Sequence, residues 1–462
     1  MKRTNGKALP ANSKKRCMGI NAGRVVTLTL SNLALQALGF VYRMMLADCA
    51  GAAALGLQSL VMQIYSISVS VCISGLNVAV VTVAARLGAA DGRGIRALTR
   101  CAMLVFCILF MLSAVPIFML RRGIALHIVG DGKTAETIPI VLVCIFLTGI
   151  ENVLKSVHIA SGRVRTTAFS EMTEQTARFF LVWLLLKGFA AGEMQAEKSH
   201  TVQLIMLGMV LSEFFSVGFL SISYFKTFVR GCALPQAQGR EAETFSTRIS
   251  ELCGILLPAA LTSVLGTVFS SSAALLLPGR LYAAGYSREA ALQTIGVLNS
   301  VAAPLVVLPM AFAGAAAAVC LPAVSAAAGA GDFERLRRIV KKSVSVLGLA
   351  VGANVLLLPF LKPLAALLFG IVPDFAVFAL LTLKFCIIYF QIVTTAILNG
   401  LKAQKHVLMY TVLSEGLQLI LIYLFAALPQ LHIYGYLAAM SAGEGLRLAL
   451  SAKKIRSVLR EP

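Results

Sequence analysis

The sequence predicts an all-α integral membrane protein with about twelve transmembrane helices in two six-helix bundles. Of its 462 residues, 58% are hydrophobic and only 13% are charged, and the mean hydropathy is +0.85. Soluble globular proteins contain about 25% charged residues, so lipid is the expected solvent for most of this chain. The apolar residues form runs of about 20, the length of one membrane crossing, and basic residues lie in the short gaps between the runs.

Twelve apolar runs, separated by polar residues and helix breakers, define the expected spans. The first run follows a basic N-terminus; it is too long for a signal-peptide core and lacks a cleavage-like end, so it is expected to be retained. The second and eighth runs exceed one crossing, so these helices are expected to tilt or bend. The expected spans are 25–47, 55–85, 101–120, 138–159, 168–186, 201–225, 252–277, 291–327, 343–361, 375–400, 407–428 and 434–452.

The distribution of Lys and Arg predicts that both termini are cytoplasmic. With the N-terminus inside, the inner segments contain 28 basic residues and the outer loops contain 8, while the other 5 of the 41 lie within spans. This excess is the positive-inside pattern. The loop with Arg121, Arg122 and Lys133 is placed outside despite its three positive charges. A multi-pass protein of the plasma membrane is therefore expected.

Similar segments in the two halves indicate a duplicated six-helix unit. Because six is even, both copies have the same orientation in the membrane, an architecture found in transporters. The matched segments are 89–96 with 330–337 and Glu174 with Glu415, both offset by 241 residues, and 159–162 with 397–400, offset by 238 residues. The expected divisions are a basic N-terminus (1–24), a first bundle (25–225), a cytoplasmic linker (226–250), a second bundle (251–452) and a cytoplasmic tail (453–462).

Helix breakers fall at comparable places in the two halves. The second span contains Gly75 and Asn77, and the eighth contains Pro304, Pro309 and Gly314. Interrupted helices at matching positions point to a transport site between the halves, near the middle of the membrane. The alternative is a simple kink, which transmembrane helices tolerate.

Ionisable residues within the spans are the candidate functional residues, because a charge inside the membrane is costly. Some lie at helical spacing from an opposite charge and can form pairs within one helix, such as Glu151 with Lys155 and Glu174 with Arg178. Four have no opposite charge three or four residues away, so each requires a partner on another helix, a water-filled cavity or a bound ion. These four are Arg43, Lys384, Glu213 and Glu415.

Two sets of residues follow from these charges. Arg43 and Lys384 lie nearer the outer ends of their spans, so they either extend to the lipid headgroups or line a cavity for a diphosphate, which an arginine can bind through two oxygens. The candidate cationic cavity comprises Arg43, Lys155, Arg178 and Lys384. The candidate polar or coupling residues are Glu151, Glu174, Glu213, Glu415, Asn77 and Asn399.

Several short motifs resemble one family. They are Leu38 to Arg43 (LGFVYR), Leu55 to Leu57 (LGL), Ser74 to Leu76 with Ala79, and Ser170 to Gln175 (SEMTEQ) with Arg178. On these residues the chain resembles the stage V sporulation protein B family of polysaccharide-biosynthesis proteins. That family belongs to the MOP superfamily of multidrug, oligosaccharidyl-lipid and polysaccharide exporters, which includes the lipid II flippases of peptidoglycan synthesis.

The resemblance implies a MATE-like fold of two six-helix bundles facing each other in a V, alternating between inward- and outward-open states. It implies movement of an undecaprenyl-pyrophosphate-linked sugar from the inner to the outer leaflet, for polysaccharide, cell-wall or spore-cortex synthesis. Arg43, Glu174 and Arg178 match charged positions of the family's first and fifth helices. The chain departs from the family at Asn77, where proline is usual. It also has Gln36 and Ala37 where many lipid II flippases carry an arginine.

Other function classes fit the sequence less well. A cation-coupled multidrug exporter of the same superfamily requires acids in its cavity; Arg43 favours an anionic cargo, while Glu213 and Glu415 keep the exporter open. A membrane glycosyltransferase or ligase requires a large structured outer loop, and the outer loops are short. Residues 132–134 (GKT) resemble the end of a P-loop, but His127 occupies the position of the earlier glycine.

The expected partners are the lipid-linked oligosaccharide and membrane lipids. Nucleic acid is excluded, because the basic residues form no polar domain with stacking aromatics. The scattered cysteines and histidines predict no metal site and no cofactor, and no catalytic residue is assigned because flipping requires no covalent chemistry. The sequence leaves open whether Na⁺ or H⁺ couples to transport, and it favours a monomer.

Overall fold

The computed structural model describes residues 22–87, 92–190, 198–230, 245–307, 310–329, 332–401 and 403–460, and these residues are almost entirely helical. The predicted all-α class is confirmed. The polar N-terminus before residue 22, residues 231–244 of the expected linker, Asp91 of the first repeat segment and Pro309 lie outside the described residues.

The first helix, α1 (Ala22–Val69), contains a sharp break at Gly51. An unbroken helix of its 48 residues would be about 72 Å long, more than twice the roughly 30 Å hydrocarbon core of a bilayer. At Gly51 the backbone leaves the helical region, with φ 74° and ψ 158°, a conformation that glycine adopts readily because it has no Cβ. The break therefore separates the first two expected spans.

The remaining helices of the N-terminal half fall on the expected spans. A π-helical segment, Ser70–Ser74, joins α1 to α2, directly before Gly75. A short segment that includes α4 (Arg121–Gly123) connects α3 to α5. The other helices of this half are α2 (Gly75–Leu87), α3 (Gly92–Met119), α5 (Thr137–Ala160), α6 (Val164–Ala190) and α7 (Lys198–Tyr224).

In the C-terminal half, the eighth expected span contains a π-helical segment, and residues 308 and 309 within it lie outside the described residues. It comprises α9 (Arg288–Gly296), a π-helical segment (Val297–Ala302), α10 (Ala303–Val307), which contains Pro304, and α11 (Met310–Gly329). The other helices are α8 (Phe245–Ala283), α12 (Phe333–Phe369), α13 (Phe375–Gly400), α14 (Gln404–Phe425) and α15 (His432–Arg460).

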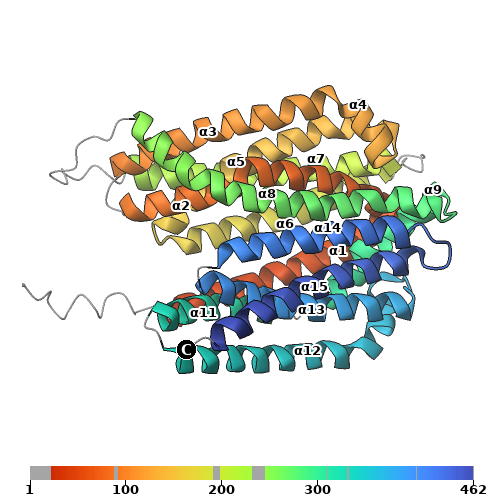
Figure 1. Ribbon diagram of the computed structural model, residues 1–462. Coiled ribbons are helices and arrows are strands. Elements are labelled where there is room, and N and C mark those ends of the chain that lie inside the picture. The colour runs from red at the N-terminus through yellow and green to blue at the C-terminus, as the bar shows by residue number, and fades with distance from the viewer. Residues whose placement is uncertain are drawn as a thin grey trace, which may run out of the picture.

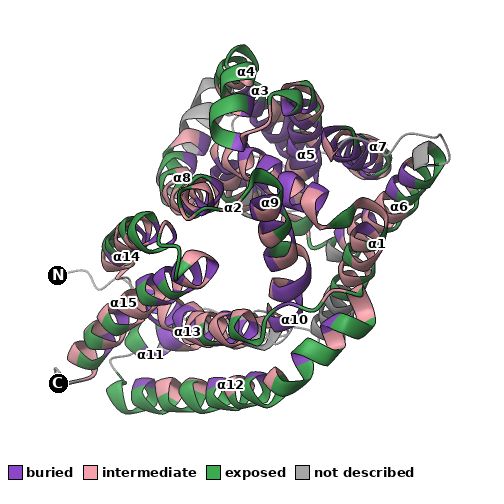
Figure 2. Ribbon diagram, turned by 90° about the vertical axis from the view of Figure 1, so that its right-hand side faces the viewer, coloured by how far each residue is buried: buried purple, intermediate pink, exposed green. Residues whose placement is uncertain are grey.

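The long helices lie side by side and form two groups. In Figure 1 the C-terminal end of the chain lies at one end of the bundle, and α4 and α9 lie at the other. Figure 2, which looks along the helices, shows α2, α3, α5, α7 and α8 in one group and α11, α12, α13 and α15 in the other. α1 and α6 lie along one flank, and α9 and α10 lie between the groups.

The first helix of each expected half also contacts the other half. The start of α8 packs on α2, where a Cβ at Gly75 would meet the backbone of Leu256 and Ala260. Conversely, Phe40 of α1 makes an edge-to-face contact with Phe369 of α12, with ring centroids 5.8 Å apart. The halves are thus joined through α1 and α8, and the expected domain boundaries stay a prediction.

Within the described ranges, nine helices are long and apolar enough to cross a membrane. The first of them, 34–84, spans the break at Gly51 and so includes two expected spans. Large apolar side chains such as Leu349, Leu356 and Leu367 are exposed along α12, as lipid contact requires. The chain is a multi-pass plasma-membrane protein; the count of twelve spans and the sidedness of the termini stay predictions.

A reporter fused after Pro462 is expected to lie in the cytoplasm, because the inner segments contain most of the basic residues. Green fluorescent protein at this position should fluoresce, and alkaline phosphatase should be inactive. A matched fusion between α4 and α5, at the end of the bundle where Figure 1 shows α4, should give the opposite pair of signals. Active phosphatase at the C-terminus would contradict the orientation.

Candidate functional site

Acidic and basic side chains alternate through the interior of the N-terminal half, forming what we term the N-half ladder: Glu171, Lys155, Glu151, Glu174, Arg178 and Glu213. They come from α5, α6 and α7. Lys155 Nζ lies 3.0 Å from Glu151, 3.5 Å from Glu171 and 3.7 Å from Glu174. The side chain of Glu171 is 41% exposed, so the ladder begins near solvent.

Arg178 joins the ladder to its third helix. Its guanidinium pairs with Glu174 on α6 and lies 3.3 Å from Glu213 on α7. Its Nε also donates a hydrogen bond of 3.3 Å to Ser212 Oγ. This fork geometry lets one arginine bridge two acids on different helices, which a single ammonium group does less well.

Serine hydroxyls also form hydrogen bonds within the N-half ladder. Ser216 of α7 donates a hydrogen bond to Glu151 of α5, and Ser216 and Ser170 of α6 share a hydrogen bond of 2.6 Å. Ser170 and Glu174 are four residues apart, as are Ser212 and Ser216, so each pair lies on one helix face. The sequence therefore directs these polar groups toward one point between three helices.

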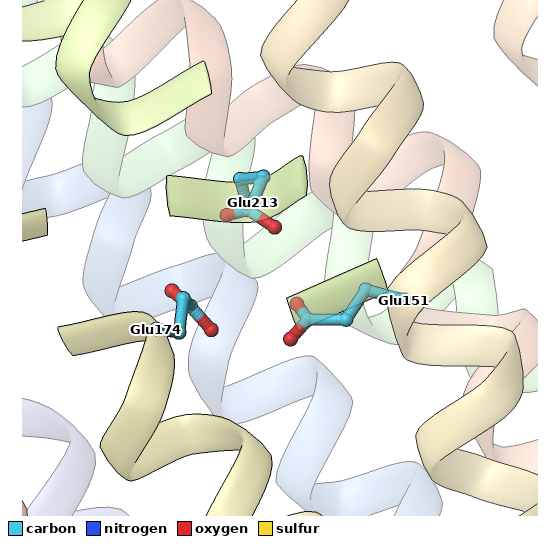
Figure 3. Close-up of side chains that lie close together, drawn as sticks. All are labelled: Glu151, Glu174 and Glu213. Carbon is cyan, nitrogen blue, oxygen red and sulfur yellow. The ribbon is translucent and has the colours of Figure 1, made fainter. Parts of the chain in front are cut away.

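The buried part of the N-half ladder has one more acid than base. Glu151, Glu174 and Glu213 are only 2%, 6% and 2% exposed, and Lys155 and Arg178 are the two bases that contact them. Figure 3 shows the three carboxylates converging, with one oxygen of each within 4.8 Å of the others. Glu213 Oε2 is buried without a hydrogen-bond partner among the described residues.

A small amide and hydroxyl cluster lies on α2 and α5. Asn77 donates a hydrogen bond of 3.1 Å to Asn152 and accepts one of 3.2 Å from Ser156. Asn77 stands where the resembling family usually has proline; unlike proline, it can bond across helices. The departure thus replaces a helix breaker with an interhelical contact, three residues after the π-helical segment.

A second group of charges lies in the C-terminal half. Glu415 of α14 lies 4.0 Å from Arg447 of α15 and accepts a hydrogen bond of 3.3 Å from Gln418. Lys384 of α13 lies 3.4 Å from the sulfur of Met440. Buried atoms of Glu444 and Arg447 have no hydrogen-bond partner among the described residues. Glu174 and Glu415, matched by the repeat, thus each face an arginine.

Arg43 lies apart from both groups. It is exposed on α1, three residues after Phe40, which packs on α12, and one after Tyr42, which packs against α6 residues such as Val182. In the part of the chain that the structure describes, it has no ion pair. Its helix therefore touches both halves at a point where a positive charge remains uncompensated. Asn399, near the end of α13, is half-buried.

No protein-family model matches the sequence. The chain is 22% identical to stage V sporulation protein B of Bacillus subtilis (strain 168) over 439 residues, covering 94% of this chain and 83% of that protein. It matches an inward-facing multidrug resistance MATE family transporter of the MOP superfamily with a TM-score of 0.71 and 16% identity, covering 93% of this chain and 98% of the other. The chain therefore has the fold of these MOP superfamily transporters.

Other MOP structures match at a similar level. The outward-facing conformation of a MATE family transporter gives a TM-score of 0.63, with 16% identity and coverage of 94% of this chain and 95% of the other. A MOP superfamily transporter from Pyrococcus furiosus gives 0.64, with 16% identity and the same coverage. These likenesses confirm the fold class that the sequence motifs imply.

Within this fold, the candidate residues do not all lie in one place. Lys155 and Arg178 both contact Glu174, in a group that also includes Glu151 and Glu213. The other candidates lie elsewhere: Lys384 and Glu415 in the C-terminal half, Arg43 on α1, Asn77 on α2 and Asn399 on α13. Their functional roles stay predictions.

Sequence reasoning missed the groups that complete the N-half ladder. Glu171 and Ser170 lie in the SEMTEQ motif and Ser212 directly precedes Glu213, yet none was assigned a role. The detectable signal was the spacing: Ser170 lies four residues before Glu174, and Ser216 three after Glu213. Polar residues that share a face with a buried charge are candidates to bond it.

Proposed function

We propose that this MOP-superfamily transporter moves a polyprenyl-pyrophosphate-linked sugar from the inner to the outer leaflet by alternating access. The observation that carries the proposal is Arg43, an uncompensated cation on a helix that touches both halves. A guanidinium binds two oxygens of a diphosphate at once. The motifs that resemble the stage V sporulation protein B family imply this cargo class, and the chain is similar to that protein along 94% of its own length.

The physical task divides between lipid and protein. The polyprenyl tail stays in the hydrocarbon of the bilayer, so its movement involves no transfer from water. The charged headgroup crosses through a polar path between the halves. No bond is made or broken. Net movement requires that the headgroup binds in both the inward- and outward-open states.

The N-half ladder is proposed as the site of cation coupling. Its buried part has three acids and two bases, and an unpaired buried charge is strongly unfavourable. One additional positive charge, a proton or a Na⁺ ion, would balance it. The unpartnered Glu213 Oε2 offers a ligand or proton acceptor for that charge, and hard cations prefer carboxylate oxygens.

Cation-coupled multidrug export is the second candidate. The same acid excess favours it, because cationic drugs require negative charge along their path, and the structural neighbours include multidrug resistance transporters. Arg43 separates the candidates, since a cation at this position repels a cationic drug and attracts a diphosphate.

Arg43→Ala is expected to reduce flipping of a pyrophosphate-linked lipid about 10²-fold or more, because a charge-assisted contact with the headgroup is lost, about 1.5–3 kcal/mol for each hydrogen bond. The purified protein, reconstituted in liposomes, would be given a labelled undecaprenyl-pyrophosphate sugar, and its exposure in the outer leaflet followed with a membrane-impermeant quencher. A cationic dye in the same liposomes tests the exporter.

The matched control is Lys187→Ala, which removes an exposed cation at the far end of α6. This variant should flip the lipid at the wild-type rate. If a normally folded Arg43→Ala protein flips the lipid at the wild-type rate, Arg43 does not bind the headgroup. Transport of the dye without flipping of the lipid by the wild type would replace the flippase proposal with the exporter.

A further inference from the structure

At the end of the bundle that holds α9, two glycines bring helices of the two halves into backbone contact. Gly56 lies in the part of α1 that follows the break at Gly51, and Gly296 ends α9. A Cβ at Gly56 would lie closer than 3.0 Å to the carbonyl of Leu292, and a Cβ at Gly296 would lie equally close to the carbonyl of Ala52. Because both obstacles are backbone, no side-chain rotation relieves them.

The two glycines are separated by nearly the same offset as the matched segments of the two halves. Asn299 donates a hydrogen bond of 3.3 Å to Ser59, and these residues are 240 apart in the sequence. The same spacing relates Gly56 to Gly296 and Ala52 to Leu292. Each half therefore presents the same short element, and each glycine meets the residue that precedes its counterpart by four. The contact is self-complementary, as in a twofold-symmetric dimer.

Further contacts between the halves surround this crossing. Arg288 at the start of α9 lies 3.4 Å from Asp131, and Glu289 lies 2.6 Å from Lys198. These side chains are largely exposed, so the ion pairs contribute little to holding the end closed. Close backbone packing between small residues is the main contact. Ser59, which accepts the hydrogen bond from Asn299, itself donates one to the carbonyl of Gly56 within α1.

We propose that the Gly56–Gly296 crossing is the gate at this end of the transporter, closed in this structure and separated when the other state forms. The inference rests on the alternating access of the proposed function but not on its cargo. The fold matches an inward-facing MATE family transporter with a TM-score of 0.71 and an outward-facing one with 0.63. An inward-facing state is closed on the outer side, so the crossing is assigned to the outer side.

The repeat explains why such a gate opens as a unit. Either glycine contact can persist only while the two helices lie at backbone distance, so both contacts separate together. A bulkier residue at either position prevents the closed state without touching the N-half ladder or Arg43. Gly56→Ala and Gly296→Ala are therefore expected to shift the protein toward the state that is open at this end.

The first test measures closure by disulfide formation between Ser59→Cys and Asn299→Cys in liposomes without cargo. The pair should cross-link in the wild-type background. Adding Gly296→Ala should slow cross-linking about tenfold, the effect of a moderate shift in a two-state equilibrium. Gly266→Ala is the matched control, because a Cβ at this helical glycine of α8 meets nothing within 4 Å; it should leave the rate unchanged.

The second test needs no added bulk, so it does not depend on the alanine variants folding. Oxidising the Ser59→Cys/Asn299→Cys pair should stop transport of whichever cargo the wild type moves, and reduction should restore it. Equal cross-linking in the Gly296→Ala and Gly266→Ala backgrounds, or unimpaired transport by the cross-linked protein, would overturn the gate. Failure of the wild type to flip lipid would leave the cross-linking result intact, so the two proposals are tested separately.

Discussion

Arg178→Met is expected to destabilise the protein by about 3–5 kcal/mol, the cost of removing one partner from a buried ion pair. The arginine contacts Glu174 and Glu213 from a position that is largely buried. Methionine keeps the length and apolar stem of the side chain, so the loss is mainly one of charge. The midpoint of thermal unfolding of the purified protein checks this prediction. It is obtained from the fraction of protein that remains monodisperse after heating.

The double variant Arg178→Met/Glu174→Gln supplies the internal control. Neutralising an acid removes part of the uncompensated negative charge, so the double variant should be more stable than Arg178→Met alone. Together with Glu174→Gln alone, these variants give the coupling energy as the departure of the double variant from the sum of the two single variants. Lys187→Met, an exposed change on the same helix, should have little effect. An Arg178→Met protein as stable as the wild type would show that the ladder's charges are not held as pairs.

Much of the fold is readable from the sequence because lipid imposes strong rules. Backbone groups inside a bilayer must be hydrogen-bonded within the protein, and an apolar run of about 20 residues achieves this as one helix, so helices are expected at the apolar runs. The length of the first helix requires a turn, and Gly51 provides it. Composition does not determine which helices contact each other. The packing of α8 on α2 at Gly75 is not predictable from the sequence, because apolar and small residues occur on most of the helices.

The sequence predicts five of the six charged residues of the N-half ladder, all except Glu171, but not the net charge of the group. Spacing identified Glu151, Lys155, Glu174 and Arg178 as intrahelical pairs, and the need for a distant partner was recognised for Glu213. The sequence alone predicts that Lys155 and Arg178 line a cationic cavity. In three dimensions α7 brings Glu213 against Arg178, so the same bases are neutralised. Net charge at a point depends on helix packing, which a single sequence does not encode locally.

Glu213→Gln is expected to abolish the dependence of transport on the coupling cation. The substitution leaves two buried acids with two bases, so the ladder no longer requires an additional positive charge. In the wild type, one charge moving through 100 mV contributes about 2.3 kcal/mol, roughly a fiftyfold change in the distribution of cargo between leaflets. The variant should lose this gain while keeping its basal exchange rate in the absence of a gradient.

The measurement compares cargo accumulation in liposomes with a pH gradient, with a Na⁺ gradient and with neither, which also distinguishes the two cations. Glu171→Gln is the matched control, because this acid is 41% exposed and water screens its charge, so gradient dependence should persist. A Glu213→Gln protein that still responds fully to the gradient would place the coupling charge elsewhere. The C-terminal group of Glu415 and Arg447 would then be the next candidate, since the repeat makes Glu415 the counterpart of Glu174.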